Sequence, residues 1–167
     1  WGSAITVGKD RPELLADFPA VRALGERGLA LEEDWNHGAL HALMLSVEAA
    51  TPAALGGSPD KAKQHYPRAV ELGHGKDALV HVNYAESVAV PAQDRAAFDE
   101  VLNKALAIDV NAEPELRLAN TLAQEKARWL LEHAGDYFLT DDEPAADEEP
   151  EPDTSDEPTD PDGDPSR

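Results

Sequence analysis

The stretch YAESVAVPAQDRAAFDEVLNKALAID, residues 84–109, decides the fold because two helical patterns meet there at one proline. Apolar residues recur every three or four positions on both sides of Pro91, which is the period of an amphipathic helix. Proline cannot donate the hydrogen bond that would continue a helix, and it disfavours helical geometry at Val90. The stretch therefore predicts two packed helices with a corner between them.

The charged residues of this corner have two interpretations. Glu86 and Asp94 flank the proline and could act as paired carboxylates in acid–base catalysis, which requires one of them to lie in an apolar pocket. Alternatively, Asp94 favours the dipole at the first turn of the next helix, while Arg95 reaches back to Glu86. We favour the second interpretation, in which the corner is held by a salt bridge and carries no catalytic residue.

The same helical period recurs along most of the chain, and no convincing alternating run of β-branched residues interrupts it. The fold is predicted to be all-α. The expected helices are a stub ending near Val7 and the segments 18–31, 37–50, 59–72, 77–90, 92–108 and 115–138.

Residues typical of helix ends separate these segments. Asp17 precedes Pro19 as a helix start, and Asn36 is a candidate cap for the next helix. In GGSPD, Ser58 is predicted to be an N-cap with Pro59 at the first helical position, where a missing N–H costs nothing.

A weak internal repeat accompanies the helices. The segments RGLALEED (27–34), RAVELGHG (68–75) and KALAIDVN (104–111) each end a helix with small or apolar residues and a turn. Their matching positions Gly28, Ala69 and Ala105 lie 41 and 36 residues apart. This spacing is near the repeat of about 34 residues in tetratricopeptide arrays. We expect residues 1–139 to form antiparallel helix pairs in a tetratricopeptide-like domain.

Composition separates a second region and excludes several classes of function. The chain has 167 residues, no cysteine and a net charge of −20, and residues 140–167 hold 13 acidic residues, one basic residue and six prolines. This segment is predicted to be a disordered acidic tail. We favour a solvating role for it over the alternative of an arm that docks on a basic partner or holds Ca²⁺ weakly. Nucleic acid is an improbable partner for so acidic a chain, and no apolar run of 18 residues predicts a membrane span.

Two histidines raise the question of a metal site. His37 and His41 are four residues apart in NHGALH, a spacing that can place two imidazoles on one zinc ion. Metalloprotease helices have a glutamate after the first histidine, but Gly38 stands there, and a third ligand from Glu33, Glu48, His65 or His81 is not evident. We predict histidines that cap, pack or face solvent, and no metal.

Other catalytic chemistries lack their motifs. The chain has no Cys and no G-x-S-x-G segment, and LGGSPDK lacks the spacing of a phosphate-binding loop. We therefore predict no nucleophilic residue and no nucleotide cofactor.

The last predicted helix offers the candidate ligand residues. Its expected apolar face consists of Leu116, Ala119, Leu122, Ala123, Leu130 and Ala134. Arg117, Asn120 and Gln124 fall on one flank of that face. Amides beside a core must be hydrogen-bonded if buried, so they either join neighbouring helices or line a ligand cavity. Trp129 is as well placed in the core as on a ligand platform.

Three motifs together carry a family resemblance: LGGSPDKAKQHYPRAVEL, then YAESVAVPAQDRAAFDEVLNKALAID, then ELRLANTLAQEKARWLLEHAGDYF. With the Gly-Gly turn, the Gln-Asp-Arg triplet and the Trp-Leu-Leu helix in this order, residues 1–139 resemble the TRAP transporter T-component family. The resemblance implies a helical, tetratricopeptide-like periplasmic lipoprotein that works beside the solute-binding protein of a TRAP transporter. It implies no catalytic residue.

The resemblance and the sequence together predict a non-enzymatic module that docks the solute-binding protein and shelters a small apolar or organic-anion ligand. The start, WGSAITVGKDRP, reads as the end of a helix and a loop, so a longer parent chain is expected. The resemblance implies that the upstream part of this parent chain carries a lipid anchor. Homo-oligomerisation is left open. The alternatives are a general protein-interaction scaffold and a small metal-dependent hydrolase.

Overall fold

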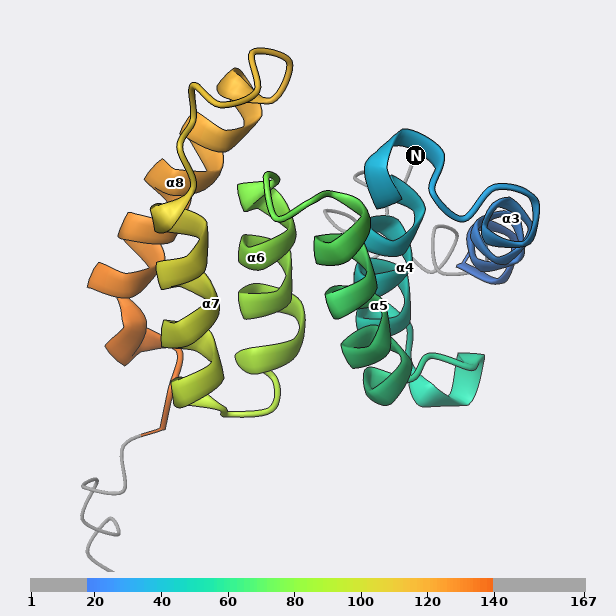
Figure 1. The fold of residues 1–167 in the computed structure, drawn as a ribbon. Coiled ribbons are helices and arrows are strands. Elements are labelled where there is room, and N and C mark those ends of the chain that lie inside the picture. The colour runs from blue at the N-terminus through green and yellow to red at the C-terminus, as the bar shows by residue number, and fades with distance from the viewer. Residues whose placement is uncertain (1–17, 140–167) are drawn as a thin grey trace, which may run out of the picture.

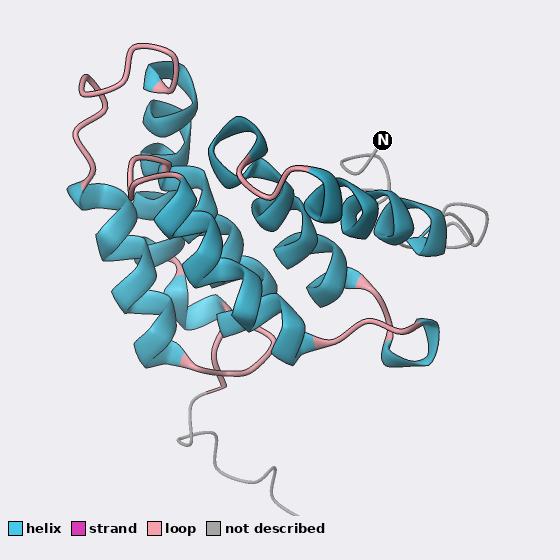
Figure 2. Cartoon of the chain, turned by 45° about the vertical axis from the view of Figure 1, so that its right-hand side comes forward, coloured by secondary structure: helices cyan, strands magenta, loops and turns pink. Residues whose placement is uncertain are grey.

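A computed structural model describes residues 18–139, and every regular element in this range is helical. The all-α prediction is confirmed. The elements are α3 (Phe18–Leu31), η1 (Trp35–Gly38), α4 (Ala39–Ala50), η2 (Ala53–Leu55), α5 (Pro59–Leu72), α6 (Ala78–Tyr84), a π-helical turn η3 (Ala85–Ala89), α7 (Arg95–Ala107), α8 (Arg117–Glu132) and η4 (Ala134–Asp136). Figure 2 shows the loops that join them, of which the one between α7 and α8 is the longest.

Helices α4 to α8 alternate in direction and lie side by side, while α3 crosses one end of the row (Figure 1). Helix α3 packs on α4, α4 on α5, and α6 on both α7 and α8. The tetratricopeptide-like repeat and the domain boundary at residue 139 remain predictions. The stub near Val7, the cap at Asp17 and the tail 140–167 lie outside the described residues.

Small residues let α6, α7 and α8 approach one another closely. Alanines supply much of their shared core, and Phe98 at its centre is fully buried. The Phe98 ring meets Phe138 edge to face, with centroids 5.1 Å apart. The core contains Ala78, Val82, Ala85, Ala89, Phe98, Val101, Leu102, Ala105, Ala123, Ala127, Leu130 and Ala134.

Of the two expected helix caps that fall within the described residues, one forms and one does not. The Ser58 hydroxyl accepts from the Lys61 amide at 3.3 Å, with Pro59 at the first position, which confirms that prediction. The cap at Asn36 is wrong, as is the helix start at His37. Both residues have positive φ, 46° and 56°, so α4 begins only at Ala39, after Gly38 at φ 83°.

The corner after α6 differs from the prediction in its ion pairs. Arg95 binds Asp99 on its own helix at 2.9 Å, and Glu86 binds Lys126 of α8 at 2.7 Å, so the predicted Arg95–Glu86 bridge is wrong. The reason is that the π-helical turn directs Glu86 toward α8. Asp94 caps α7 by accepting from the Ala97 amide at 2.9 Å.

Gln93 joins the same corner to the end of the described chain. Its side-chain nitrogen donates to the carbonyls of Val90 and Tyr137, each at 3.0 Å, and its oxygen accepts from the Leu139 amide at 2.9 Å. In the Gln-Asp-Arg triplet, therefore, the first two residues hold the corner by hydrogen bonds to the backbone.

The last helix is shorter than expected, and the predicted apolar face is wrong in part. Helix α8 ends at Glu132, because the chain then turns through η4 toward α7. Ala119 and Leu122 are exposed, whereas the amides Asn120 and Gln124 are buried. The buried face is rotated toward the polar flank because backbone groups of α6 and α7 satisfy those amides.

Candidate functional site

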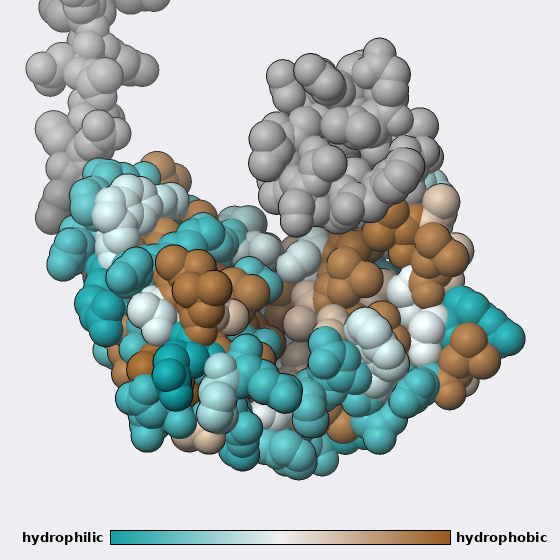
Figure 3. Space-filling model, turned by 90° about the horizontal axis from the view of Figure 1, so that it is seen from above, coloured by the Kyte–Doolittle hydropathy of each residue, from teal (hydrophilic) through white to brown (hydrophobic). Residues whose placement is uncertain are grey.

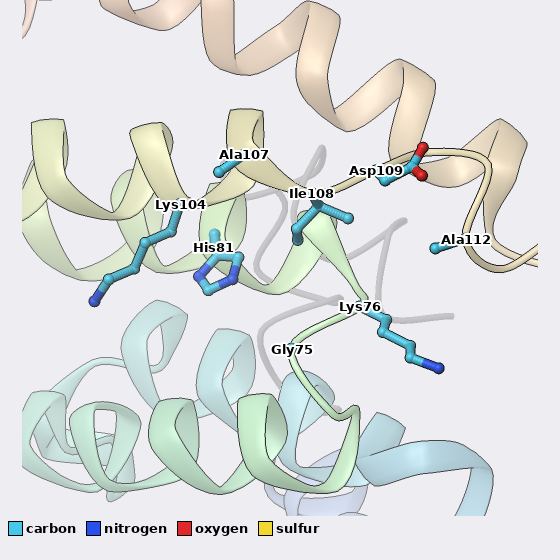
Figure 4. Close-up of a pocket in the computed structure, with 8 residues that line it drawn as sticks. All are labelled: Gly75, Lys76, His81, Lys104, Ala107, Ile108, Asp109 and Ala112. Atoms are coloured by element: carbon cyan, nitrogen blue, oxygen red, sulfur yellow. The ribbon is translucent and has the colours of Figure 1, made fainter.

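A hollow of about 390 Å³ lies at the end of the helices where the α5–α6 turn and the α7–α8 loop meet (Figure 4). Figure 3 looks onto this end, where hydrophobic residues reach the surface beside hydrophilic ones. The lining residues are Gly75, Lys76, His81, Lys104, Ala107, Ile108, Asp109 and Ala112. The lining is thus largely apolar, with the imidazole of His81 and the charged side chains of Lys76, Lys104 and Asp109.

His81 is the buried polar residue of this hollow. It lies within the apolar segment of α6 and is only 4% exposed. Its Nδ1 is 2.7 Å from the Tyr66 hydroxyl. Burial, with a smaller contribution from the Lys104 charge, lowers the pKa of His81 to about 4, so the imidazole is neutral near pH 7.

The Tyr66 hydroxyl is the hydrogen-bond partner of that imidazole. Burial raises the pKa of Tyr66 to about 12, so the phenol keeps its proton near pH 7 and can either donate to Nδ1 of His81 or accept from it. Within residues 18–139, the buried side-chain atom that has no hydrogen-bond partner is Glu48 Oε2, not a nitrogen of His81. The first hollow is therefore lined by a neutral imidazole that is held by Tyr66.

Two lysines border the hollow, and each forms an ion pair with a glutamate outside its lining. Lys104 Nζ is 2.6 Å from Glu100 Oε1 on the same helix, and Lys76 pairs with Glu113 across the turn and the loop. The Lys76 ammonium lowers the pKa of the Glu113 carboxyl. All four side chains are at least one-third exposed, so solvent weakens both pairs.

A second hollow, of about 480 Å³, lies on the other side of Lys76. Its lining includes Asn36, His37 and His74, three residues with positive φ, beside Glu113 and Glu115. Non-glycine residues in this conformation store strain of about 1–3 kcal/mol each. Lys76 lines both hollows, and its partner Glu113 lines the second, so the two hollows adjoin at the same end of the helices.

Asn120 and Gln124 hold the two segments that border the first hollow. Asn120 accepts from the Ala78 amide at 2.9 Å and donates to the Lys76 carbonyl at 2.8 Å. Gln124 donates to the carbonyls of Ala105 and Ile108 at 3.0 and 2.7 Å. Both amides thus join α8 to neighbouring parts of the chain by hydrogen bonds, which is the arrangement expected if they join helices rather than line a ligand cavity.

The other two predicted ligand residues lie at the surface. Arg117 is exposed at the first position of α8, and Trp129 is 49% exposed with its ring stacked on His133, centroids 4.3 Å apart. None of Arg117, Asn120, Gln124 and Trp129 lines either hollow described above. A ligand role for them stays a prediction.

The histidines His37 and His41 are not brought together. His37 lines the second hollow, whereas His41 Nδ1 lies 2.8 Å from His65 Nδ1 and its Nε2 lies 3.2 Å from Glu33. Glu33 in turn binds Arg68, which chiefly lowers its pKa to about 2. Among residues 18–139, no group of three or more potential ligands is arranged to hold a metal ion.

The outer face of α8 carries exposed apolar side chains. Leu118, Leu122 and Trp129 are 72%, 56% and 49% exposed, and their spacing of four and seven residues places them on one face of the helix. The terminal helix of a helical array usually has a polar outer face. This stripe, here called the α8 stripe, is therefore a candidate contact surface.

Sequence comparison places the chain among known proteins. A family model described as TRAP transporter T-component matches residues 1–138. An uncharacterized protein of Treponema pallidum (strain Nichols) is 35% identical over 114 residues, which make up 68% of this chain and 35% of that protein. The matched segment thus spans about a third of that relative's length.

Proposed function

The chain belongs to the TRAP transporter T-component family, and from that premise we propose a non-enzymatic accessory role in TRAP-type solute uptake. In this role the protein docks the periplasmic solute-binding protein of the transporter. The family match over residues 1–138 is the observation that carries the proposal.

The α8 stripe supports docking. Leu118 and Leu122, with Trp129, expose apolar surface that a partner would remove from water, at about 25 cal/mol per Å². Partly exposed tryptophans are frequent anchors in protein interfaces. We assign the solute-binding protein to this stripe, and a second copy of the chain is the competing occupant.

The hollows support the second half of the proposal, in which the protein shelters a small apolar or anionic ligand. Both open at the same end of the helices and share Lys76 as a lining residue. A ligand held there would lie beside the turns at that end of the helices and away from the middle of the α8 stripe.

The proposed location is the periplasm, with attachment to the membrane through a lipid on a longer parent chain. No described helix is long and apolar enough to span a bilayer. Lipid attachment is testable by membrane fractionation of cells that express the parent chain.

Native mass spectrometry of the parent chain mixed with the solute-binding protein of the same transporter tests docking. The expected result is a one-to-one complex, absent when the solute-binding protein of an unrelated TRAP system is used as control. Self-association of the parent chain alone would assign the α8 stripe to a second copy. A spectrum of free proteins only would refute the docking role and favour a general interaction scaffold.

A further inference from the structure

We propose that His41 and His65, here called the histidine pair, form a pH-dependent switch that joins α4 to α5 near neutral pH and separates when both imidazoles are protonated. Separation releases η1, the turn that forms one wall of the second hollow. This switch is built into the fold and is independent of the docking role proposed for the α8 stripe.

The two rings of the histidine pair face each other through equivalent nitrogens. His41 Nδ1 lies 2.8 Å from His65 Nδ1, which is a hydrogen-bond distance. A hydrogen bond between two ring nitrogens contains one proton, so one of the two Nδ1 atoms must carry no hydrogen. The contact therefore tolerates one positive charge on the pair. Two imidazolium rings would bring two N–H donors face to face and break it.

The surrounding charges decide which ring receives the second proton. His41 is buried, and its Nε2 lies 3.2 Å from Glu33 Oε1, so this nitrogen donates to the carboxylate and a first added proton lies beside an opposite charge. Glu33 stays ionised because Arg68 chiefly lowers its pKa to about 2. His65 is half-buried, and burial lowers its pKa, with smaller contributions from the charges of His41 and Lys61. His65 therefore takes the second proton at a pH below about 6.5.

Charged groups on the neighbouring elements are held by other partners. Arg22 of α3 binds Glu26 and Glu48, Glu71 of α5 binds Arg68, and Glu86 of η3 binds Lys126. His81 of α6 contacts Tyr66, and its pKa of about 4 keeps it neutral above pH 5. His37 of η1 lines the second hollow and is a further imidazole beside the turn, so it requires a control of its own.

The histidine pair holds one side of η1. Glu33 and His41 flank this turn and contact each other, so residues 33–41 form a closed loop. Hydrogen bonds tie the loop to α5 through Arg68 at Glu33 and through His65 at His41. Residues 36–38 inside it all have positive φ, a conformation that non-glycine residues keep only where the surrounding structure enforces it. Loss of the His65 contact removes one of these ties, so η1 relaxes.

Relaxation of η1 changes the second hollow. Asn36, His37 and Gly38 line that hollow. The backbone of Gly38 approaches α5 so closely that an added Cβ would come within 2.8 Å of Leu72 Cβ. A relaxed η1 loses this close approach, and the wall of the second hollow therefore depends on pH.

Trp35, at the start of η1, reports on the switch in the full chain. Its indole N–H resonance should shift in one step as the pH falls from 7.5 to 5, with a midpoint below about 6.5, measured by ¹H–¹⁵N NMR. The Ala39 amide, which donates to the Asn36 carbonyl, should exchange with solvent at least about tenfold faster at pH 5, after correction for the intrinsic pH dependence of exchange. Absence of either change would overturn the proposal.

Three variants separate the histidine pair from other histidines. His65→Gln can still donate to or accept from His41 Nδ1 but cannot be protonated, so both pH effects should be lost. His65→Lys is charged throughout this pH range and should give the acidic resonance of Trp35 already at pH 7.5.

The control is His37→Asn, which removes the imidazole of η1 itself and should keep both pH effects. Asparagine is chosen because it tolerates the positive φ at this position. Persistence of the pH effects in His65→Gln, a neutral-pH resonance of Trp35 in His65→Lys, or loss of the effects in His37→Asn would each overturn the assignment to the histidine pair.

Discussion

Replacing Asn120 by leucine should strongly destabilise the protein, because this buried amide satisfies two backbone groups that precede and begin α6. The residue is 1% exposed, accepts from the Ala78 amide and donates to the Lys76 carbonyl. Leucine has a similar size but can replace neither bond. The turn that carries Lys76 would lose its attachment to α8.

The magnitude follows from the burial of the two stranded groups. Ala78 is fully buried, so its amide would stay unpaired at a cost of about 1–3 kcal/mol. Lys76 is exposed, so its carbonyl can recover water and loses only about 0.5–1.5 kcal/mol. The expected loss of unfolding free energy is about 2–4 kcal/mol, which lowers the melting temperature by about 10 °C.

Urea denaturation followed by far-ultraviolet circular dichroism measures this loss. Asn103→Leu is the matched control, because Asn103 is exposed and its amide donates only within α7, to the Asp99 carbonyl. The control should change stability by no more than about 0.5 kcal/mol. If Asn120→Leu changed the unfolding free energy as little as the control does, the joining role of this amide would be refuted.

Three further predictions concern other parts of the chain. The pKa of His81 is about 4 in the folded protein and about 6.5 when unfolded, so the unfolded state binds more protons between these values. The free energy of unfolding should therefore fall by up to about 3 kcal/mol as the pH drops from 6.5 to 4. The His81→Gln variant should lack the part of this pH dependence that comes from the imidazole. Equal urea midpoints at pH 4.5 and pH 7 for the unmodified protein would contradict the prediction. Asp94→Ala removes the cap of α7 and should lower the free energy of unfolding by about 1 kcal/mol, measured by urea denaturation. Asp60→Ala, at the surface of α5, is the control and should lower it by less. Truncation after Leu139 removes a segment whose composition cannot form a core. The melting temperature of the truncated protein should therefore stay within a few degrees of that of the full chain. A much larger fall would mean that residues 140–167 pack on the helices.

Local signals were sufficient for the helices whose ends depend on neighbouring residues. The segments 18–31 and 59–72 agree with α3 and α5, and at the start of α5 the pair Ser58 and Pro59 defines the cap within two positions. The start of α4 was missed because it depends on three consecutive residues with positive φ, of which only Gly38 is a glycine. The sequence alone does not indicate which asparagine or histidine will adopt a left-handed backbone conformation.

Long-range partners could not be derived in the same way. Arg95 had a plausible partner in Glu86, but Lys126, 40 residues further along the chain, takes that carboxylate. Asn120 and Gln124 were recognisable as amides beside a core, yet their acceptors lie 44 and 16 residues away in loops.

His81 was considered only as a distant metal ligand. A histidine within the apolar segment ALVHVNY signals a buried imidazole, but its partner Tyr66 is 15 residues earlier and belongs to another helix. Which ring nitrogen faces the hollow therefore depends on how α5 packs against α6.

Docking of the solute-binding protein is the central claim, and a calorimetric titration with variants of the α8 stripe tests it most directly. The parent chain carrying Trp129→Ser should bind the cognate solute-binding protein at least about tenfold more weakly than the unmodified chain. Leu24→Ser, at a 73% exposed leucine of α3, should bind with unchanged affinity. Equal affinity of the Trp129→Ser and Leu24→Ser chains, or no heat of binding from the unmodified chain, would contradict the account.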